Sequence, residues 1–381
     1  MKIAINLLYL IPDHVGGTQT YAISLIQALA KVDTENEYIL FVNRESANLE
    51  IVDAPNFRRV ICPVLARRRE MRYAYEQLIL PKLLDRHQIN LVHSLGYVCP
   101  LNVSCANIVT IHDLNYHALR DSMTPGKRLL LGWFVRQSAR RADHILTVSE
   151  FSRGQIIQFL GIDPASVTVT HLGPRALSEG KNEDWQEVSA RYRIAGPYVM
   201  AFSGLSPHKN IQRLLQAYAK VCTGLPHTLV LVGHLPEGGA VRAEMSRLGI
   251  SNRVIVTGYV PDSHVMLLIK HADVFVFPSL YEGFGLPVLD AQQAGVVVAC
   301  SAAACLPEVA GKAAVLFDPL SIEEMTAAIR TCILDQPLRS RLMELGFQNV
   351  QQFSWEQTAL QTRSIYQKFG MQRTERNKEK A

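Results

Sequence analysis

Short apolar segments alternate with longer amphipathic segments along almost the whole chain. Residues 2–9 form an apolar run suited to a strand buried on both faces, and residues 18–31 follow with the apolar spacing of a helix. Parallel strands need a long crossover connection, which is usually a helix, so this alternation is typical of parallel sheets covered by helices. The sequence therefore predicts an α/β fold built from doubly wound parallel sheets.

The length of the chain and one interruption of this pattern predict two domains. The chain has 381 residues, whereas an ordinary domain has about 150. The alternation stops at residues 173–196, where glycine, proline and charged residues are frequent, and we expect the interdomain linker there. We predict these parts in chain order: a Rossmann-like domain over residues 1–172, the linker over 173–196, a second Rossmann-like domain over 197–353, a helix over 354–369 and a disordered, charged tail over 370–381.

The expected elements follow from the apolar periodicity of each segment. In the first domain we expect further strands at residues 38–43, 91–94, 107–112, 144–149 and 167–171, and helices at 73–87 and 125–142. In the rest of the chain we expect strands at residues 198–203, 228–232, 254–257, 274–278 and 297–301, and helices at 210–221, 287–294, 322–335 and 358–369. Each predicted domain therefore has enough strands for a sheet of its own.

Composition excludes several classes of protein. Hydrophobic residues make up 48% and charged residues 19% of the chain, which fits a soluble globular protein rather than a disordered one. No apolar run reaches the about 18 residues that span a bilayer, and residues 3–11 lack the cleavage site of a signal peptide, so we expect a cytoplasmic protein. The seven cysteines include no Cys-x-x-Cys pair, which disfavours a disulfide framework and a cysteine metal site.

The distribution of charge says more than its sum. A net charge of +5 is too small to indicate a nucleic-acid partner. Residues 58–86 contain eight basic and three acidic residues, and residues 120–153 contain seven and three. Such clusters suit contact with anionic lipid head groups, at about 1 kcal/mol for each basic side chain, or they are ordinary solvated helix faces. The sequence leaves both interpretations open, and peripheral contact with the inner membrane face is one of them.

Two motifs in the first domain are candidates for ligand binding. Gly16 and Gly17 lie between the first strand and the first helix, where glycine lets the backbone approach a ligand and the helix start offers N–H groups to an anion. A tight turn without a ligand would show the same glycines. His112 and Asp113 end a predicted strand, and ligands of doubly wound sheets bind at that edge. A hydrogen-bonded structural pair is the alternative there.

A third motif opens the second domain, where Ser203 and Gly204 are followed by His208 and Lys209. Lys209 would stand at the positive end of the next helix, where charge and dipole together would hold a phosphate. A solvated lysine is the alternative interpretation. No Asp-x-Asp occurs in the chain, which disfavours a carboxylate-bound Mg²⁺ or Mn²⁺, so we expect neither a metal nor a cofactor.

The fourth motif runs from Glu282 to Asp290 and is the most informative. Glu282 follows a buried strand, two glycines free the backbone after it, and a helix begins at a Leu-Pro pair. Carboxylates can bind hydroxyl pairs, while amides near a helix start bind phosphate. A nucleotide sugar carries both groups. The candidate donor-binding residues here are Glu282, Gly283, Phe284, Gly285, Leu286 and Asp290.

With these motifs in this order, the chain resembles glycosyltransferase family four, the large retaining group with the two-domain GT-B fold. The resemblance covers almost the full length. It rests on Gly16-Gly17, His112-Asp113-Leu114, Val148-Ser-Glu-Phe-Ser152, Ser206-Pro-His-Lys-Asn210, Ala272-Asp-Val-Phe-Val-Phe-Pro-Ser-Leu-Tyr-Glu-Gly-Phe-Gly-Leu-Pro287 and Leu306-Pro-Glu308-Val.

The resemblance implies a role for each motif. Lys209 would contact the donor diphosphate, Glu282 would hold hydroxyls of the transferred sugar, and Asp290 would bind the nucleotide ribose. His112 would line the reaction centre, and Gly16 with its neighbour would close over donor and acceptor. It also implies that the first domain binds the acceptor, the second binds the nucleotide sugar, and the last helix packs back on the first domain.

Three departures from the family pattern stand out. Gly204 or Leu205 stands where the family often has arginine, so a second cation would have to come from elsewhere, such as His208. Asp290 replaces the second glutamate and is one methylene shorter. Gly295-Val-Val-Val replaces the usual Gly-Val-Pro-Val.

The resemblance implies a retaining, metal-independent hexosyltransferase that uses a nucleoside diphosphate sugar. By the same resemblance, mannose from GDP-mannose is the first expectation for the donor, and a lipid-linked saccharide of bacterial surface polysaccharide, such as lipopolysaccharide, for the acceptor. The alternatives are a catalytically silent GT-B binding module, and an epimerase or dehydrogenase on similar domains.

Overall fold

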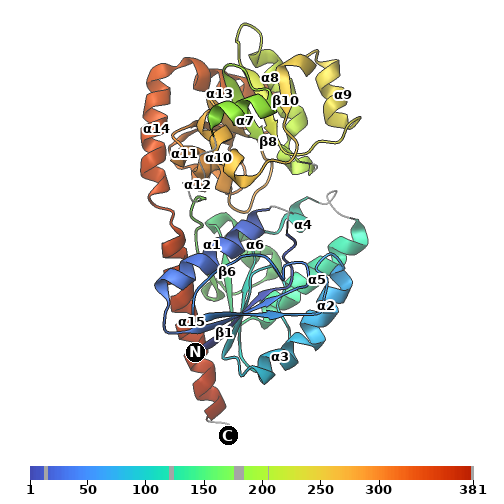
Figure 1. Ribbon diagram of the computed structural model, residues 1–381, viewed down its shortest axis with the longest axis vertical. Coiled ribbons are helices and arrows are strands. Elements are labelled where there is room, and N and C mark those ends of the chain that lie inside the picture. The colour runs from blue at the N-terminus through green and yellow to red at the C-terminus, as the bar shows by residue number, and fades with distance from the viewer. Residues whose placement is uncertain (13–15, 120–123, 176–183, 205, 379–381) are drawn as a thin grey trace. The chain divides into compact units, whose positions relative to one another are not determined.

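The computed structural model describes residues 1–12, 16–119, 124–175, 184–204 and 206–378. The chain divides into two compact units (Figure 1). Unit 1 comprises Met1–Gly173 with Ser354–Ala381, and unit 2 comprises Pro174–Phe353. Each unit contains its own parallel sheet.

Unit 1 is built on a seven-stranded sheet of order β3-β2-β1-β4-β5-β6-β7, in which every pairing is parallel. Its strands are β1 (Lys2–Leu7), β2 (Glu37–Val42), β3 (Phe57–Ile61), β4 (Leu91–Ser94), β5 (Ala106–Thr110), β6 (His144–Thr147) and β7 (Val167–Val169). Every residue of β4, β5 and β6 is buried, as expected for central parallel strands. The edge strand β3 has polar, exposed positions, and the sequence pattern missed it for that reason.

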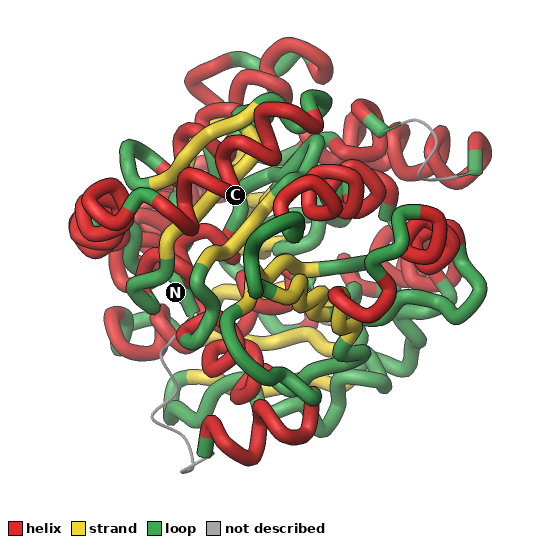
Figure 2. The backbone as a smooth tube through the Cα atoms, turned by 90° about the horizontal axis from the view of Figure 1, so that it is seen from above, coloured by secondary structure: helices red, strands yellow, loops and turns green. Residues whose placement is uncertain are grey.

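In Figure 2 helices lie around the strands of the whole chain. Unit 1 has its own set of helices. They are α1 (Gly17–Val32), α2 (Arg69–Leu78), α3 (Leu80–Arg86), α4 (Asn115–Ala118), α5 (Pro125–Arg141), α6 (Glu150–Leu160) and α15 (Trp355–Lys378), with a 3₁₀ turn at Pro164–Ser166. The single helix expected at residues 73–87 is two helices, α2 and α3. Pro81 lies in the first turn of α3, and proline suits a helix start because it has no N–H to donate.

The last helix belongs to unit 1 and is longer than expected. It packs along α1. The guanidinium of Arg363 lies 3.0 Å from the carboxylate of Glu35 and 3.7 Å from that of Asp33. The predicted disordered tail 370–381 is wrong for most of its length, because α15 continues to Lys378. Gly370 alone does not stop the helix, since the residues after it include good helix formers and no proline.

Unit 2 contains a six-stranded parallel sheet of order β10-β9-β8-β11-β12-β13. Its strands are β8 (Tyr198–Phe202), β9 (Thr228–Val232), β10 (Val254–Val256), β11 (Val274–Phe277), β12 (Val297–Ser301) and β13 (Ala314–Phe317). Its helices are α7 (Trp185–Tyr192), α8 (Ile211–Val221), α9 (Ala240–Arg247), α10 (Asp262–Lys270), α11 (Leu286–Gln293), α12 (Leu306–Ala310), α13 (Ile322–Leu334) and α14 (Gln336–Val350), with 3₁₀ turns at Pro207–Lys209 and Ser251–Arg253.

Alternate residues of β8 enter two separate cores, one on each face of the sheet. Val199 and Ala201 pack with side chains of α8 and α13. Tyr198 and Met200 pack with side chains of α10 and α11. Since successive side chains of a strand point to opposite faces, helices on both faces explain the apolar runs from which the strands were predicted.

The predicted linker 173–196 is only partly a linker. Its second half folds as α7, which Asp184 caps by accepting a hydrogen bond from the backbone of Gln186. Trp185 stacks on His271 with ring centroids 4.1 Å apart, and Val188 is buried. This helix of eight residues is too short for its periodicity to stand out in the sequence.

No helix within the described part of the chain combines the length and apolar character that crossing a membrane requires.

Candidate donor site and the surroundings of His112

Two predicted site residues of unit 2 form an ion pair. Lys209 Nζ lies 2.7 Å from Glu282 Oε1, and the ammonium lies 5.2 Å from the centroid of the Phe277 ring. The side chains are 26% and 17% exposed, so a ligand can reach both. Lys209 follows β8 and Glu282 follows β11, and these strands are neighbours in the sheet, which brings the two motifs together at one edge.

Asn210 joins the two loops that carry this pair. Its φ of 58° is left-handed, a conformation that asparagine adopts more readily than most residues. Its side-chain amide donates to the carbonyl oxygens of Pro278, at 3.1 Å, and Pro319, at 2.7 Å. The Leu280 amide also donates to the His208 carbonyl at 2.8 Å. The position of the Lys209 backbone is therefore set by bonds to the loop after β11.

The segment after Glu282 is held in place by contacts with Cys305 and Leu306. Gly285 has a φ of 103°, and a Cβ there would lie 2.6 Å from a methyl carbon of Leu306, so only glycine fits. The thiol of Cys305 donates to the carbonyl oxygens of Glu282, at 3.2 Å, and Phe284, at 2.9 Å. Gly283, Phe284, Gly285 and Leu286 are all buried.

Asp290, the expected ribose ligand, is buried beside an arginine. Its carboxylate is 0% exposed. It faces Arg175, whose backbone N–H donates to Oδ1 at 2.9 Å and whose Nε lies 3.4 Å from Oδ2. Burial raises the pKa of Asp290 to about 6, although Arg175 opposes the shift. The backbone of Arg175 therefore occupies Oδ1, while Oδ2 is buried with the guanidinium near it but makes no hydrogen bond. The ribose role implied by the resemblance stays a prediction.

The other predicted donor-binding residues of the 203–210 loop are His208, Ser203 and Gly204. Burial lowers the pKa of His208 from its usual 6.5, against the influence of Glu282, so burial favours the neutral form of this side chain. Ser203 lies against Gly233, where a Cβ would meet its carbonyl oxygen at 2.6 Å. A Cβ at Gly204 would meet no atom within 4 Å. Leu205 lies outside the described residues.

His112 lies in unit 1, just after the end of β5, and is buried. Its Nε2 is 2.9 Å from the carbonyl oxygen of Leu95, which can only accept, so the proton is on Nε2. The rings of Tyr21 and Tyr97 pack on it edge-to-face, with centroids 4.7 and 5.3 Å away. Burial lowers the pKa of His112 to about 4, so the ring is neutral at physiological pH. The neighbouring Asp113 accepts from the Tyr97 hydroxyl at 3.2 Å.

The glycine turn opens α1 as the sequence suggests. Gly17 is the first helical residue, and the Gly16 carbonyl accepts from the amides of Gln19, at 3.0 Å, and Thr20, at 3.3 Å. A Cβ at Gly17 would meet no atom within 4 Å. The residues just before this turn, 13–15, lie outside the described part of the structure. Within the described ranges, no group of three or more His, Cys, Asp or Glu side chains could hold a metal ion.

Two family models match successive parts of the chain. The model described as Glycosyltransferase Family 4 matches residues 15–173, and the model described as Glycosyl transferases group 1 matches residues 187–348. The chain belongs to glycosyltransferase family 4. It is a hexosyltransferase, and its two Rossmann-like domains form the GT-B fold.

Individual relatives of this glycosyltransferase agree with the assignment. It is 29% identical over 371 residues to the O-antigen chain mannosyltransferase B of Escherichia coli, covering 92% of this chain and 95% of the relative. The sucrose-phosphate synthase of Thermosynechococcus elongatus has the same fold, with a TM-score of 0.76 at 19% identity over 96% of this chain and 98% of that chain. HepE of Anabaena, solved in complex with UDP and glucose, gives a TM-score of 0.75 at 18% identity over 97% of this chain and 100% of that one.

A buried chain of hydrogen bonds in unit 1 connects the last helix of the glycosyltransferase to His112. The Tyr366 hydroxyl lies 2.6 Å from Nδ1 of His93, whose Nε2 lies 2.8 Å from the Thr110 hydroxyl. That hydroxyl lies 3.0 Å from the hydroxyl of Tyr21, which packs on His112. Burial lowers the pKa of His93 to about 3. The chain of hydrogen bonds ends at Tyr21, whose ring packs edge-to-face on the buried His112.

The structure adds three residues that the sequence analysis did not assign to the site: Arg175, Asn210 and Cys305. Asn210 was expected as the first residue of the helix 210–221 and as part of a motif of the resemblance, without a role at the site. Cys305 carries no sequence signal, because its role depends on a fold that brings it to the 282–284 backbone. Arg175 lies 115 positions from Asp290, within the segment interpreted as a linker.

Proposed function

We propose that this glycosyltransferase moves a hexosyl unit from a nucleoside diphosphate sugar to an acceptor hydroxyl, with retention of the anomeric configuration and without a metal ion. The observation that supports this most is the Lys209–Glu282 pair, at 2.7 Å and partly exposed. It offers a carboxylate for sugar hydroxyls beside an ammonium for a diphosphate. A donor that carries both groups would replace the contact between the two side chains.

The proposed reaction has one bond exchange on one face of the sugar. The bond from the anomeric carbon to the diphosphate breaks, and its electron pair goes to the phosphate oxygen. The acceptor oxygen bonds to the same face of that carbon, and its proton passes to the departing phosphate. Lys209 and the amides near the start of α11 would stabilise the charge on the phosphate, and such preorganised charge is usually the largest catalytic contribution.

The unit 1 residues would act on the acceptor side. A neutral His112, with its proton on Nε2, is suited to accept or orient a hydrogen bond through Nδ1 and not to supply a positive charge. Gly16 and Gly17 would bring backbone close to the donor and acceptor, because neither has a side chain. No candidate residue is expected to act as a covalent nucleophile.

We propose mannose from GDP-mannose as the first donor to test, and a lipid-linked saccharide at the inner membrane face as the acceptor, in the synthesis of a bacterial surface polysaccharide. The relative that supports this is the Escherichia coli O-antigen chain mannosyltransferase B, which matches nearly the full chain. The basic clusters of unit 1 would contact anionic lipid. Flotation with anionic liposomes tests that contact, and reversing the charges of residues 67–72 should abolish it.

A panel of nucleotide sugars, assayed for transfer and for slow hydrolysis, tests the donor proposal. We expect one donor to be used, and Lys209→Ala and Glu282→Ala to lose most of that turnover. Near wild-type turnover by either variant contradicts the site. Activity that EDTA abolishes and Mn²⁺ restores contradicts metal independence. A chain that transfers no sugar and is not thermally stabilised by any nucleotide would be a catalytically silent module. The burial of Asp290 beside Arg175 favours this alternative.

A further inference from the structure

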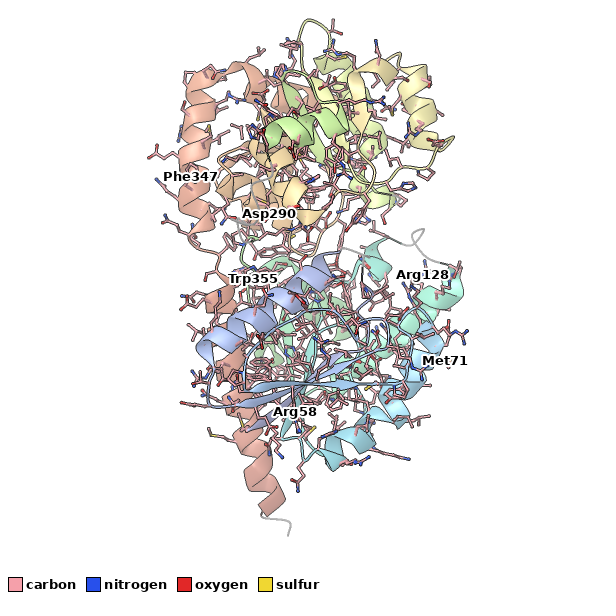
Figure 3. All side chains as sticks on the ribbon, viewed as in Figure 1. Arg58, Met71, Arg128, Asp290, Phe347 and Trp355 are labelled. Atoms are coloured by element: carbon pink, nitrogen blue, oxygen red, sulfur yellow. The ribbon has the colours of Figure 1, made fainter. Side chains whose placement is uncertain are left out.

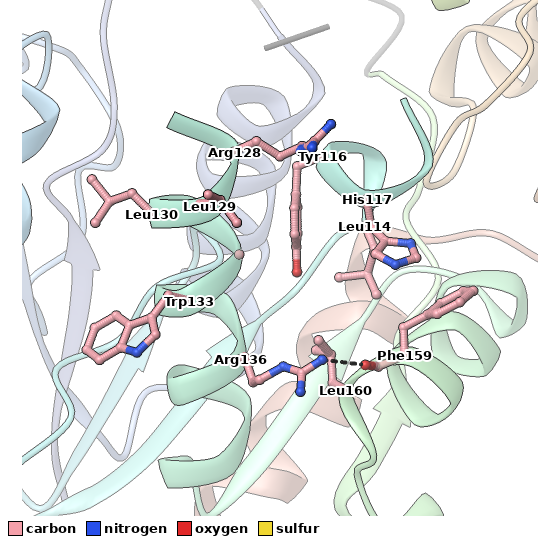
Figure 4. A pocket seen from close by; sticks show the side chains of 11 residues that line it. Leu114, Tyr116, His117, Arg128, Leu129, Leu130, Trp133, Arg136, Phe159 and Leu160 are labelled. Atoms are coloured by element: carbon pink, nitrogen blue, oxygen red, sulfur yellow. Dashed lines mark hydrogen bonds between the residues drawn. The ribbon is translucent and has the colours of Figure 1, made fainter. Parts of the chain in front are cut away.

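A cavity of about 860 Å³ lies in unit 1 beside α5, between that helix, α4 and α6 (Figure 4). Its inner wall is formed by buried Leu114 and Leu160, with Phe159 beside them. Leu129 and Trp133 of α5 line the outer side. Binding pockets of this size, about 300 to 1,000 Å³, commonly hold a small molecule against mainly apolar walls.

The charged residues that line this cavity carry one sign. Arg128 and Arg136 of α5 line it, and no Asp or Glu does so among the described residues. Arg136 donates from Nη2 to the carbonyl oxygen of Phe159 at 3.1 Å, which holds the guanidinium at the wall. That bond uses one of the five N–H groups of the guanidinium, whose planar fork suits a phosphate.

The rim of the cavity is apolar although it faces solvent. Leu129 is 71% exposed and Trp133 is 52% exposed, while α5 contains five basic residues and no acidic one. Exposed apolar side chains that cluster beside a cavity mark a binding surface more often than isolated ones do. Trp and Leu beside Arg and Lys are the combination found where proteins meet the boundary of a lipid layer.

The surface next to α5 has the same character. The Tyr73 ring of α2 packs on the Phe134 ring of α5 with centroids 4.5 Å apart, so the two basic clusters of the sequence meet on neighbouring helices. Met71 of α2 is exposed and lies on the same side of unit 1 as Arg128 (Figure 3). Of the ten exposed large apolar side chains described in unit 1, eight lie at residues 61–79 or on α5.

We propose that the cavity beside α5 binds an anionic amphiphile, specifically a single-chain isoprenoid or alkyl phosphate. The chain would lie against Leu114, Phe159 and Leu160, and the phosphate would be held at Arg136. A neutral apolar ligand would make no use of the Arg136 guanidinium at the wall, and a small anion would not fill the apolar part of the cavity. The inference rests on the proposed function in one respect, since a lipid-linked acceptor would present such a group.

The test is equilibrium binding of farnesyl phosphate to the full chain, below the concentration at which the probe aggregates. Calorimetry gives the stoichiometry and tryptophan fluorescence follows Trp133 at the rim. We expect one farnesyl phosphate per chain, with farnesol and inorganic phosphate each binding at least about tenfold more weakly. Equal binding of farnesol, full competition by inorganic phosphate, or many probes per chain would overturn the proposal.

A second arm separates the single-chain phosphate from a membrane phospholipid. Soluble dihexanoylphosphatidylglycerol carries an anionic head on two short chains, and we expect it to bind at least about tenfold more weakly than farnesyl phosphate. Equal or tighter binding of the phospholipid would overturn the assignment to a single-chain phosphate.

A matched pair of variants on α5 separates the cavity from general electrostatics. Leu129→Glu places a carboxylate on the cavity lining and lowers the net charge by one, whereas Lys127→Glu changes an exposed residue outside the lining and lowers it by two. We expect Leu129→Glu to weaken binding at least about tenfold and Lys127→Glu less than about threefold. The reverse order would show attraction to the charged helix only and would overturn the proposal.

Both positions are exposed, so both variants should unfold at the wild-type temperature, which a thermal melt checks. Donor hydrolysis is measured beside binding and should not change in either variant, because neither residue belongs to the donor site. Farnesyl phosphate binding without turnover of any donor would contradict the proposed function alone, and turnover without binding would contradict this inference alone.

Discussion

The two carboxylates of the 282–290 motif are eight positions apart in the sequence and have opposite surroundings in unit 2. Glu282 lies in a loop, partly exposed, with Lys209 at 2.7 Å. Asp290 lies within α11, fully buried, with Arg175 along its side. Both are acid–base pairs, yet only the first can exchange its partner for a ligand without first opening the domain.

The difference shows how one sequence motif can serve both binding and structure. A partly exposed ion pair contributes little to stability, because water and salt screen it, so evolution can use its charges for a ligand at small cost to the fold. A buried carboxylate is costly unless it is paired. Arg175 therefore joins the first residues of unit 2 to α11 through Asp290.

Removing the charge of Glu282 should give the largest effect. Glu282→Gln keeps the size of the side chain but loses its attraction for Lys209 and its strength as an acceptor of hydroxyl groups. We expect kcat/KM with the identified donor to fall between about 100-fold and 1,000-fold, the usual loss when one preorganised electrostatic contact is removed.

The control is Glu323→Gln, which breaks the Lys220–Glu323 pair, also at 2.7 Å but on the surface. Its kcat/KM should stay within about twofold of wild type, because an exposed surface pair contributes little. Equal losses in the two variants would show that Glu282 has no special role and would remove the basis of the comparison.

Breaking the buried Arg175–Asp290 pair should lower the free energy of unfolding more than it lowers the rate of transfer. Arg175→Met leaves the Asp290 carboxylate buried without its guanidinium, and we expect the free energy of unfolding at pH 7 to fall by about 3 kcal/mol. Urea denaturation measures the change. Arg247→Met, which removes an exposed partner of Glu244, should leave the midpoint unshifted.

The double variant Arg175→Met with Asp290→Asn removes the stranded charge and should recover most of the lost stability. If the double variant is no more stable than Arg175→Met alone, the arginine contributes by packing and not by neutralising Asp290. The Asp290 carboxylate would then not depend on an ionic partner.

The pH dependence of stability isolates Asp290 next. Burial raises the pKa of this carboxyl from 3.8 to about 6, so between these values the folded state binds more protons than the unfolded state. Stability from this group is therefore full below about pH 4 and is lost as pH rises through 6, with a slope of at most about 1.4 kcal/mol per pH unit.

Comparing the wild type with Asp290→Asn cancels the other titrating groups. The asparagine variant should gain stability relative to the wild type as pH rises from 4 to 6, and the difference should level off above about pH 7. A difference that is constant with pH would mean that Asp290 stays charged in the folded state.

The sequence was sufficient for the fold class because the strands are buried on both faces, which produces continuous apolar runs. The α/β prediction and the two-sheet GT-B architecture are confirmed. The edge strands β3 and β13 were missed because half-exposed strands carry polar or short segments, as at Arg58 and Arg59. Several helices of the structure were not predicted either, among them α6, α7 and α14.

The site was predictable where chemistry and topology coincide. Lys209 and Glu282 were chosen separately, each at the end of a strand, and parallel topology brings such ends to one edge of a sheet. Their catalytic roles stay predictions. The partner of Asp290 could not be predicted, since nothing in the sequence near Arg175 shows that it returns to α11. The neutrality of His112 also depends on burial by Tyr21 and Tyr97, which only the tertiary structure shows.

Cys305 gives the smallest effect and the finest test of how the donor loop is held. Its thiol donates to the carbonyl oxygens of Glu282 and Phe284, so it positions the carboxylate without touching a donor. Cys305→Ala should raise KM for the donor about threefold to tenfold, equivalent to about 1 kcal/mol for a lost hydrogen bond, with kcat changed less.

Two variants separate positioning from packing at this cysteine. Cys305→Ser keeps a donor on the side chain and should restore most of the affinity, whereas Cys332→Ala removes another buried thiol, which is 4.0 Å from the Val298 carbonyl oxygen, and should leave KM unchanged. If serine is no better than alanine, or if Cys332→Ala raises KM equally, the loop is held by packing alone. The hydrogen bond from Cys305 would then have no part in positioning Glu282.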